Sequence, residues 1–296
     1  MSELNSEAVR SLHAINQWVD VIESNINGTQ RTAYKKKTPT FTMDNKNLTG
    51  TVSSGFRPKN QIGDVMLPSA SLEISDVRSD FSQGAIIQTT ERTNLAIQGV
   101  GFFVCTNTLD FSNTGVEMTQ YYTRDGEFQW DTQGYLRTSN GLYVVNKAFP
   151  PFAPQQATIQ ANIAAGTDSA SNYFVSKTRT LSVGPPPTTA ADIDVNSEID
   201  VDKVGLARFP QDNGLEYTKY GTSYLVEGGA SGRPLFFSTA DPGVDTMIKT
   251  GSLETSNGSM TEYIPMLASS QKMFSAVSKI IAVYNSTVDD MNALVH

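Results

Sequence analysis

The sequence contains few of the side chains on which enzymes most often rely. Among its 296 residues there is 1 cysteine, Cys105, and there are 2 histidines, His13 and His296, near opposite ends of the chain. A disulfide within the chain is therefore impossible, and a zinc site of the usual cysteine and histidine type is nearly excluded. A cysteine nucleophile activated by a histidine is disfavoured too, because no histidine lies near Cys105 in the sequence.

The chain also lacks a net positive charge and long apolar runs. Charged residues make up 18% of the chain and the net charge is -8, which argues against a nucleic-acid-binding protein. No run approaches the roughly 18 apolar residues that a membrane-spanning helix needs. Residues 1–9 are polar, and no apolar core of a signal peptide follows them. We therefore expect no transmembrane segment and, if the protein is exported, export without a cleaved signal peptide.

Both ends of the chain carry the periodicity of amphipathic helices. Near the N-terminus, apolar residues alternate at steps of four and three, at Ala8, Leu12, Ile15, Val19, Ile22 and Ile26. This pattern predicts a helix over roughly 4–27 that ends at Asn27-Gly28. Near the C-terminus, one row is spaced by seven residues, at Met260, Leu267, Phe274, Ile281, Val288 and Val295. A second row follows three residues later, at Tyr263, Ser270, Val277, Tyr284 and Met291, and the two rows predict a helix over roughly 258–295.

Such stripes fit either ordinary packing within one domain or helices that also contact neighbouring subunits. The length of the C-terminal helix favours the second interpretation, because a long amphipathic helix needs a partner surface. We predict a terminal assembly domain formed by 1–30 and 255–296, in which the helices pair like a coiled coil. One row of the C-terminal helix would meet the chain's own N-terminal helix, and the other would meet the next subunit.

The middle of the chain has the turn signals of an antiparallel β-rich domain, which we place at 81–254. Hairpin cues occur at Asp125-Gly126, Gln133-Gly134 and Asn140-Gly141. Strand-like segments surround them, at 121–124, 127–130, 135–138 and 142–145. A sandwich or barrel is expected, and the fold class is α+β, with the β-rich domain inserted between the paired terminal helices.

Two further segments do not look like compact domains. Residues 31–80 form a polar connector. Residues 146–190 form a proline-rich and alanine-rich insertion with one or two strands, such as 172–183.

Two short segments suggest binding sites but fit structural explanations better. The run that begins Asp192-x-Asp194-x-Asn196 resembles the start of a calcium loop, but Ser197 and Lys203 stand where glycine and glutamate are required. The apolar residues that alternate with it, Ile193, Val195, Ile199 and Val201, fit two strands with a solvated acidic face. Gly99-Val100-Gly101 lacks the third glycine of a dinucleotide-binding motif, which favours a bulge or a close backbone approach. We predict no catalytic, cofactor or metal site.

Several blocks in the middle of the chain resemble one known family. The run Asn94-Leu95-Ala96-Ile97-Gln98-Gly99-Val100-Gly101-Phe102-Phe103 resembles the DLAIxGxGFF signature of bacterial flagellar rod and hook proteins, with Asn94 in place of the usual Asp. Further resemblances follow in the family's order, at 122–128, 131–136, 204–215, 251–257 and 271–274. Weaker ones lie at 24–26 and 32–35. Six blocks in the right order make the resemblance specific, and the length is closer to that of the family's distal rod protein than to that of its hook proteins.

The resemblance implies a structural protein without enzymatic activity or cofactors. Members of this family polymerise into a helical axial tube, with the terminal helices inside and the β-domains outside. It implies that this chain assembles with itself and with other rod or hook subunits, leaves the cell through the flagellar type III export apparatus, and transmits torque. Its place would be the basal body, across the periplasm, or an extracellular filament. We further expect the termini to fold on assembly, because their apolar faces lack partners before it.

Two alternatives remain at this point. The chain could be a repurposed subunit of a non-flagellar extracellular filament from the same family. It could instead be a β-sandwich binding or adhesive module, in which Tyr121, Tyr122 and Trp130 line a sugar site.

Overall fold

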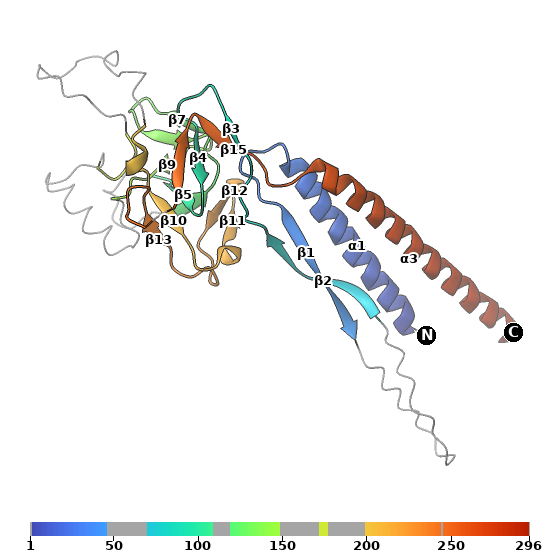
Figure 1. Ribbon diagram of the computed structural model, residues 1–296. Coiled ribbons are helices and arrows are strands. Elements are labelled where there is room, and N and C mark those ends of the chain that lie inside the picture. Colours follow the sequence, from blue (N-terminus) through green and yellow to red (C-terminus); the bar gives the residue numbers. More distant parts are fainter. Residues whose placement is uncertain are drawn as a thin grey trace, which may run out of the picture. The chain divides into compact units, whose positions relative to one another are not determined.

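The computed structural model describes residues 2–45, 70–108, 119–148, 172–176, 199–243 and 245–295. Over these residues the chain is α+β as predicted, with a helix towards each end and antiparallel strands between them (Figure 1). It divides into two compact units. The helical unit consists of Met1–Asn27, Lys37–Asp80 and Ser259–His296, and the β unit consists of Gly28–Lys36 and Phe81–Gly258.

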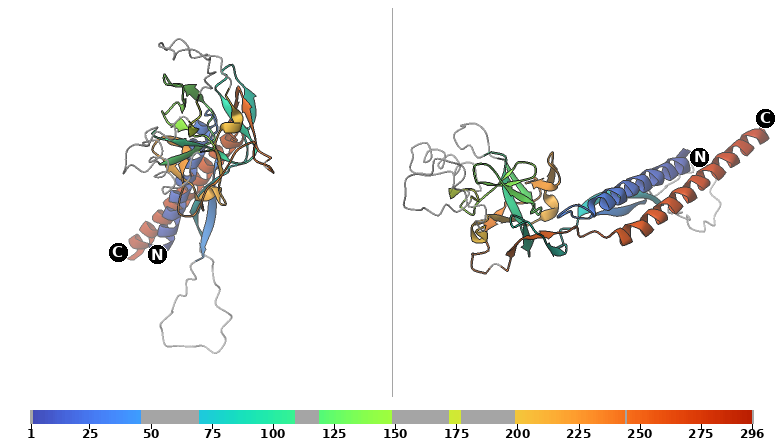
Figure 2. Two further views of the ribbon diagram at one scale, coloured as in Figure 1. Left: turned by 90° about the vertical axis from the view of Figure 1, so that its left-hand side faces the viewer. Right: turned by 90° about the horizontal axis from the view of Figure 1, so that it is seen from above.

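Two long helices dominate the helical unit. Helix α1 spans Ser2–Gly28 and helix α3 spans Met260–Val295, which confirms both helices expected from the apolar periodicity. Strands β1 (Lys37–Asn45) and β2 (Ala70–Ser79) pair antiparallel and run along α1 (Figures 1 and 2). Contacts tie this ladder to α1: the Trp18 and Phe41 rings meet edge to face at 5.5 Å, and the Ser11 hydroxyl accepts the Leu72 N–H at 3.2 Å.

The expected connector over 31–80 is therefore divided between the units. Residues 37–80 belong to the helical unit, while residues 28–36 belong to the β unit. The side-chain amide of Asn25, in the last turns of α1, donates to the Lys37 carbonyl at 2.7 Å and accepts the Lys37 N–H at 2.8 Å. These paired bonds extend the backbone ladder onto the helix, a link that polar composition alone did not reveal.

The β unit is built on one large sheet with the strand order β11-β12-β6-β5-β9-β8-β7, in which β10 pairs with both β5 and β13. Its strands are β5 (Phe102–Thr106), β6 (Gln120–Thr123), β7 (Phe128–Trp130), β8 (Leu136–Thr138), β9 (Tyr143–Val144), β10 (Leu206–Arg208), β11 (Glu216–Thr218), β12 (Gly221–Val226) and β13 (Leu235–Phe237). Every pairing is antiparallel. Strands β6 to β9 confirm the four strands expected around the hairpin cues.

Two smaller antiparallel pairs complete the β unit. Strand β4 (Leu95–Gln98) pairs with β14 (Met247–Thr250), and β3 (Ile86–Gln88) pairs with β15 (Ser252–Glu254). Both pairs join strands that are distant in the sequence. They bring the segment before the glycine turn at 99–101 next to the segment that leads into α3.

Both faces of the central strand β5 are covered. Side chains alternate across a strand, so Phe102 and Val104 enter one apolar cluster while Phe103 and Cys105 enter the other. All four are at most 2% exposed. The first cluster is closed by aromatic edge-to-face contacts, such as Tyr122 with Phe209 at 4.7 Å. The β unit thus contains a two-sided core of its own.

The expectations for 146–203 are only partly covered by the described residues. Within the insertion, Phe174 bridges to Val145 and Ser176 bridges to Tyr135, so one short extended piece lies where 172–183 was expected. The rest of that segment, and the acidic run from Asp192 to Glu198, lie outside the described residues. Val201 was expected in a strand but begins the 3-10 helix η3 (Val201–Lys203), where Val204 N–H bonds back to the Val201 carbonyl. A second 3-10 turn, η4, spans Asp212–Gly214.

Candidate assembly surface and motif sites

The predicted apolar row of α1 lies on the covered side of that helix. Ile15 and Ile22 are 1% and 2% exposed, and the other four predicted residues, Ala8, Leu12, Val19 and Ile26, are half-buried. Trp18, on an adjacent row, packs on β1 as described above. The burial of this row is therefore a property of the single chain.

The two predicted rows of α3 are covered unevenly. Tyr263 and Ser270 are buried. Five predicted residues are half-buried: Leu267, Val277, Ile281, Tyr284 and Val288. Met260 and Phe274 remain 41% and 39% exposed. The side chains of Met291 and Val295 lie outside the described part, so the rows can be followed as far as Val288.

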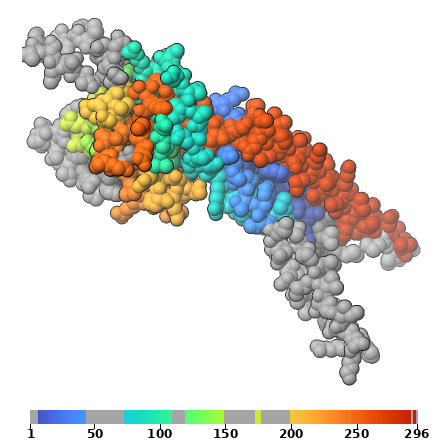
Figure 3. All heavy atoms as spheres, viewed as in Figure 1, coloured from blue at the N-terminus to red at the C-terminus, as the bar shows by residue number. Residues whose placement is uncertain are grey.

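A further apolar row on α3 is more exposed than either predicted row, and sequence reasoning missed it. We call it the outer stripe; it consists of Met266, Met273, Ile280 and Leu294, whose side chains are between 36% and 86% exposed. Figure 3 shows α3, in red, uncovered along one face. The signal was available, since each member stands one position before a residue of the first predicted row.

A shallow groove of about 330 Å³ lies between the two helices of the helical unit. Asn16 and Val19 of α1 and Gln271, Phe274 and Ser275 of α3 line it. The partly exposed ring of Phe274 therefore borders a space that none of the described residues fills. A lining of apolar, amide and hydroxyl side chains without a charged group suits a protein side chain better than a small charged ligand.

The signature at 94–103 forms two core strands and the turn that joins them. Leu95, Ala96, Ile97 and Phe103 are fully buried, and Phe102 is 2% exposed. Gly99 and Gly101 adopt φ values of 121° and 120°, which L-residues with a side chain rarely adopt. A Cβ on Gly101 would also lie 2.8 Å from the ring of Phe237. The signature therefore specifies a close backbone approach, as expected.

Asn94, the residue that departs from the signature, makes a turn contact. The side-chain amide of Asn94 donates to the Thr89 hydroxyl at 3.0 Å, and the backbone carbonyl of Asn94 accepts the Gly251 N–H at 2.7 Å. The second bond holds the beginning of β4 against the turn between β14 and β15, while the first ties it to the end of β3. An amide can donate in this way, whereas an ionised aspartate cannot.

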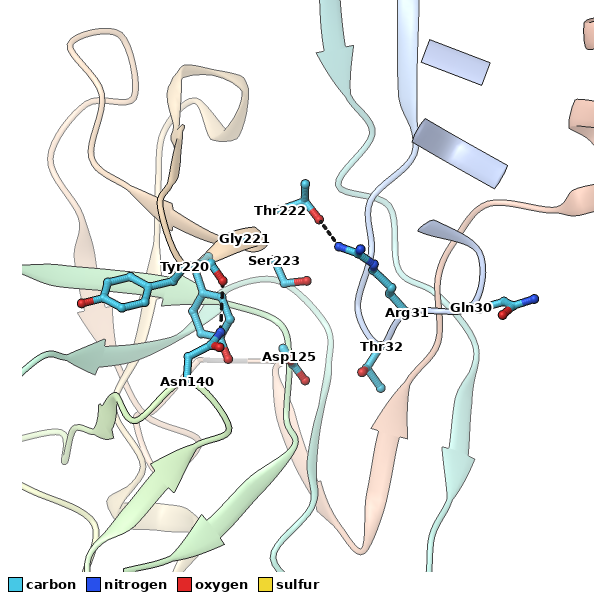
Figure 4. Close-up of a pocket in the computed structure, with 10 residues that line it drawn as sticks. Gln30, Arg31, Thr32, Asp125, Asn140, Tyr220, Gly221, Thr222 and Ser223 are labelled. Atoms are coloured by element: carbon cyan, nitrogen blue, oxygen red, sulfur yellow. Dashed lines mark hydrogen bonds between the residues drawn. The ribbon is translucent and has the colours of Figure 1, made fainter. Parts of the chain in front are cut away.

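A pocket of about 330 Å³ lies beside Asp125 in the β unit (Figure 4). Arg31 donates to the Thr222 hydroxyl at 3.5 Å, and Asn140 donates to the Tyr220 carbonyl at 3.1 Å. Burial raises the pKa of the Asp125 carboxyl from 3.8 to about 6, and the nearby charge of Glu127 acts in the same direction. The Asp125 carboxylate also accepts the Glu127 N–H at 3.2 Å, which partly offsets that shift. Its role here is that of a turn residue.

The remaining candidates for chemistry are buried in the core. Cys105 is fully buried, and burial raises the pKa of its thiol well above the usual range, so the thiol stays protonated at neutral pH. Tyr121 and Tyr122 are 8% and 1% exposed, so their rings do not form the surface row that a sugar site would need.

Within the described ranges, no cluster of three or more potential metal-ligating acidic, histidine or cysteine side chains occurs. No helix there combines the length and apolar character needed to cross a membrane.

The chain is similar to flagellar axial proteins over most of its length. A family model described as the flagellar hook protein FlgE/F/G D1 domain matches residues 96–183. The flagellar basal-body rod protein FlgG of Borreliella burgdorferi is 27% identical over 286 residues, which cover 93% of this chain and 92% of the relative. FlgG of Bacillus subtilis is 27% identical over 280 residues, which cover 92% and 91%. The chain is therefore similar to flagellar rod and hook proteins.

The similarity to rod proteins extends further along the chain than the similarity to hook proteins. The flagellar hook protein FlgE of Helicobacter pylori is 48% identical, but over only 64 residues, which are 22% of this chain and 8% of the hook protein. The rod and hook relatives are structural flagellar proteins. The similarity to these proteins agrees with the structural role that the signature at 94–103 has in the β unit.

Proposed function

We propose that this protein is a structural subunit of the flagellar axis that polymerises through its helical unit. The observation that carries the proposal is the outer stripe. It presents four large apolar side chains at the surface of one helix, all between 36% and 86% exposed. Isolated exposed apolar residues are normal on a protein surface, but a row along one helix marks a surface that binds a partner.

The physical driving force is the burial of this row against another copy. Each large apolar side chain contributes roughly 1.5–3 kcal/mol when it is fully buried, so the outer stripe and Phe274 together offset a large part of the entropic cost of association. The outer stripe would meet an unlike surface of the next copy, so the interface is head-to-tail. Repeated copies then build an open helical filament when the rotation between them does not close a ring.

The finer features of the assembly follow from the same surfaces. We infer that α1 and α3 pair like a coiled coil through Ile15, Ile22 and the inner rows of α3, and that both helices become fully ordered on assembly. The partners are further copies and other rod or hook subunits, and the place of action is the flagellum. Export through the type III apparatus without a cleaved signal, a periplasm-spanning position, torque transmission and the lack of enzymatic activity belong to the same proposal.

The test compares two single charges added to α3. Ile280→Asp places a carboxylate in the outer stripe, whereas Ser286→Asp places one at an exposed polar position on the same helix, in line with Lys272 and Lys279. The purified full-length chain is concentrated and examined by sedimentation and negative-stain electron microscopy. We expect tubes or filaments from the unmodified chain and from Ser286→Asp, and soluble monomers from Ile280→Asp.

Two results would contradict the proposal. If Ile280→Asp polymerises as well as the Ser286→Asp control, the outer stripe is not the assembly surface. If the unmodified chain stays monomeric at every concentration but binds glycans, the binding-module alternative gains the support that its buried tyrosines do not give it.

A further inference from the structure

The chain passes between the two units at four points, and the β unit joins three of the crossing segments at one place. The crossings follow residues 27, 36, 80 and 258. On the β side they belong to the segments 28–36, 81–84 and 254–258. Asn257 connects all three, because its side-chain amide donates to the Ser82 hydroxyl at 3.1 Å and accepts the Lys36 N–H at 2.8 Å. Its own N–H donates to the Tyr34 carbonyl at 3.3 Å.

Glu254 forms the charged centre of this junction. Its side chain is fully buried. One carboxylate oxygen accepts hydrogen bonds from the Lys35 ammonium group at 2.6 Å and from the Gly84 N–H at 2.8 Å. The other oxygen accepts the Arg124 guanidinium at 3.3 Å. The Glu254 carbonyl accepts the Ala33 N–H at 2.8 Å, so the main chain is bound at the same point. We call Lys35, Arg124, Glu254 and Asn257 the anchor cluster.

The two cations of the anchor cluster are themselves almost inaccessible, and both bind backbone as well as Glu254. Lys35 is 7% exposed and also donates to the Ser82 carbonyl at 2.8 Å. Arg124 is 6% exposed and also donates to the Gly99 carbonyl at 2.7 Å, in the turn of the signature. A buried carboxylate is tolerated only when it is paired and hydrogen-bonded. Removing one of its cations therefore disfavours the conformation that buries it.

The backbone beside the cluster is held in a conformation that it would not adopt alone. Among the described residues, Ala33 is the only one other than glycine with a positive φ, at 54°. Such a backbone costs free energy and persists only where the surroundings impose it. The bonds from Ala33 and Lys35 to Glu254 supply that constraint.

We propose that the anchor cluster positions the crossing segments for assembly, by clamping 28–36 and 254–258 to the folded β unit before the helices find partners. This inference rests on the proposed function, since it assigns Lys35 and Glu254 a role in presenting α1 and α3. Neither residue touches another subunit in this account; both are positioning residues. The cluster also explains why three of the blocks that resemble the family, around 32–35, 122–128 and 251–257, are distant in sequence yet serve one purpose.

The test follows hydrogen exchange of backbone amides in the soluble full-length chain. Lys35→Met keeps the length of the side chain and removes its charge, while Arg124 still pairs with Glu254, so the β unit is expected to stay folded. We expect the amides of Ala33 and Asn257 to exchange at least about tenfold faster, because a clamp with one cation less opens more often. The amides of Val104 and Val145, which bond within the large sheet, should keep their rates.

Two further variants sharpen the comparison. Lys35→Arg retains the charge and should restore most of the protection at Ala33. Lys203→Met removes the lysine of an exposed ion pair with Asp200 in the same unit, and should leave the exchange at Ala33 unchanged. Equal exchange at Ala33 in Lys35→Met and the unmodified chain would overturn the proposal. So would acceleration of the same size at Val104, since that result would make Lys35 a general stability element.

Assembly provides the second readout. Lys35→Met should raise the critical concentration for polymerisation about tenfold over that of Lys203→Met, because its crossing segments are less well positioned. An unchanged critical concentration together with local loosening would overturn the positioning role. If the unmodified chain does not polymerise at all, the proposed function fails, and the exchange result still shows whether the clamp exists.

Discussion

The two units of this chain differ in how far their apolar side chains are exposed to solvent. In the β unit, both faces of β5 are covered, and the four residues Phe102, Phe103, Val104 and Cys105 are at most 2% exposed. On α3 of the helical unit, Tyr263 and Ser270 are the only described side chains that are buried, while the outer stripe stays at the surface. The difference indicates that the β unit is a finished fold, whereas the helical unit becomes complete only when it binds another copy.

The largest effect is expected from removing the same ring in each unit. Phe103 is fully buried and meets Phe128 edge to face at 5.2 Å, whereas Phe274 is 39% exposed. Phe103→Ala should destabilise the β unit by about 3–5 kcal/mol through lost burial and a cavity. Phe274→Ala should change the stability of the β unit by less than about 0.5 kcal/mol. Urea unfolding followed by Trp130 fluorescence in a Trp18→Phe background measures both, and equal shifts of the midpoint would remove the contrast between the units.

A smaller effect is expected from adding a methyl group at Gly126, where the backbone lies against that of Leu95. A Cβ on Gly126 would lie 1.6 Å from the Leu95 carbonyl oxygen, whereas a Cβ on Gly229 would meet nothing within 4 Å. Gly126→Ala should therefore cost about 2–3 kcal/mol of unfolding free energy, because the β4 backbone must move. Gly229→Ala is the matched control and should stay within about 0.5 kcal/mol. Thermal unfolding by circular dichroism compares them, and a neutral Gly126→Ala would show that β4 yields more readily than a close-packed core allows.

The smallest effect is a pH dependence confined to the β unit. The pKa of Asp125 is raised from 3.8 to about 6, so between these values the folded chain holds a proton that the unfolded chain releases. The contribution of this group is thus present at low pH and is lost as the pH rises through that window, by about 2 kcal/mol. The stability of Asp125→Asn relative to the parent should therefore be greater at pH 7 than at pH 4. If the difference between the two proteins does not change with pH, the carboxyl is not buried as described.

The sequence allowed the helices to be predicted more fully than the contacts between segments. Seven-residue spacing defined α1 and α3, and Asp-Gly and Asn-Gly turns marked β6 to β9, because these signals are local. The ladder of β1 and β2 was missed, since its largely polar strands look like a connector until Trp18 and Asn25 are seen to contact β1. The anchor cluster was missed for the same reason: Lys35 and Glu254 are 219 positions apart, and a pairing over such a distance leaves no periodic pattern.

The candidate surface shows what a helix period reveals and what it cannot. The rows on α3 were evident from spacing, but spacing does not say which row the chain covers by itself. Tyr263 and Ser270 are buried, Phe274 is not, and the outer stripe containing Met273 and Ile280 is the most exposed of the rows. That choice depends on which partner surface is present, which is a property of the fold.

The contrast between the units is tested most directly by the protein's 2 tryptophans, one in each unit. Trp18 packs on Phe41 in the helical unit, and Trp130 packs against the core of the β unit. Urea unfolding is recorded for Trp130→Phe, which reports the helical unit, and for Trp18→Phe, which reports the β unit, at protein concentrations about a hundredfold apart. We predict that the Trp18 transition moves to higher urea as the concentration rises while the Trp130 transition stays fixed. Coincident transitions whose urea midpoints do not change with protein concentration would contradict the account.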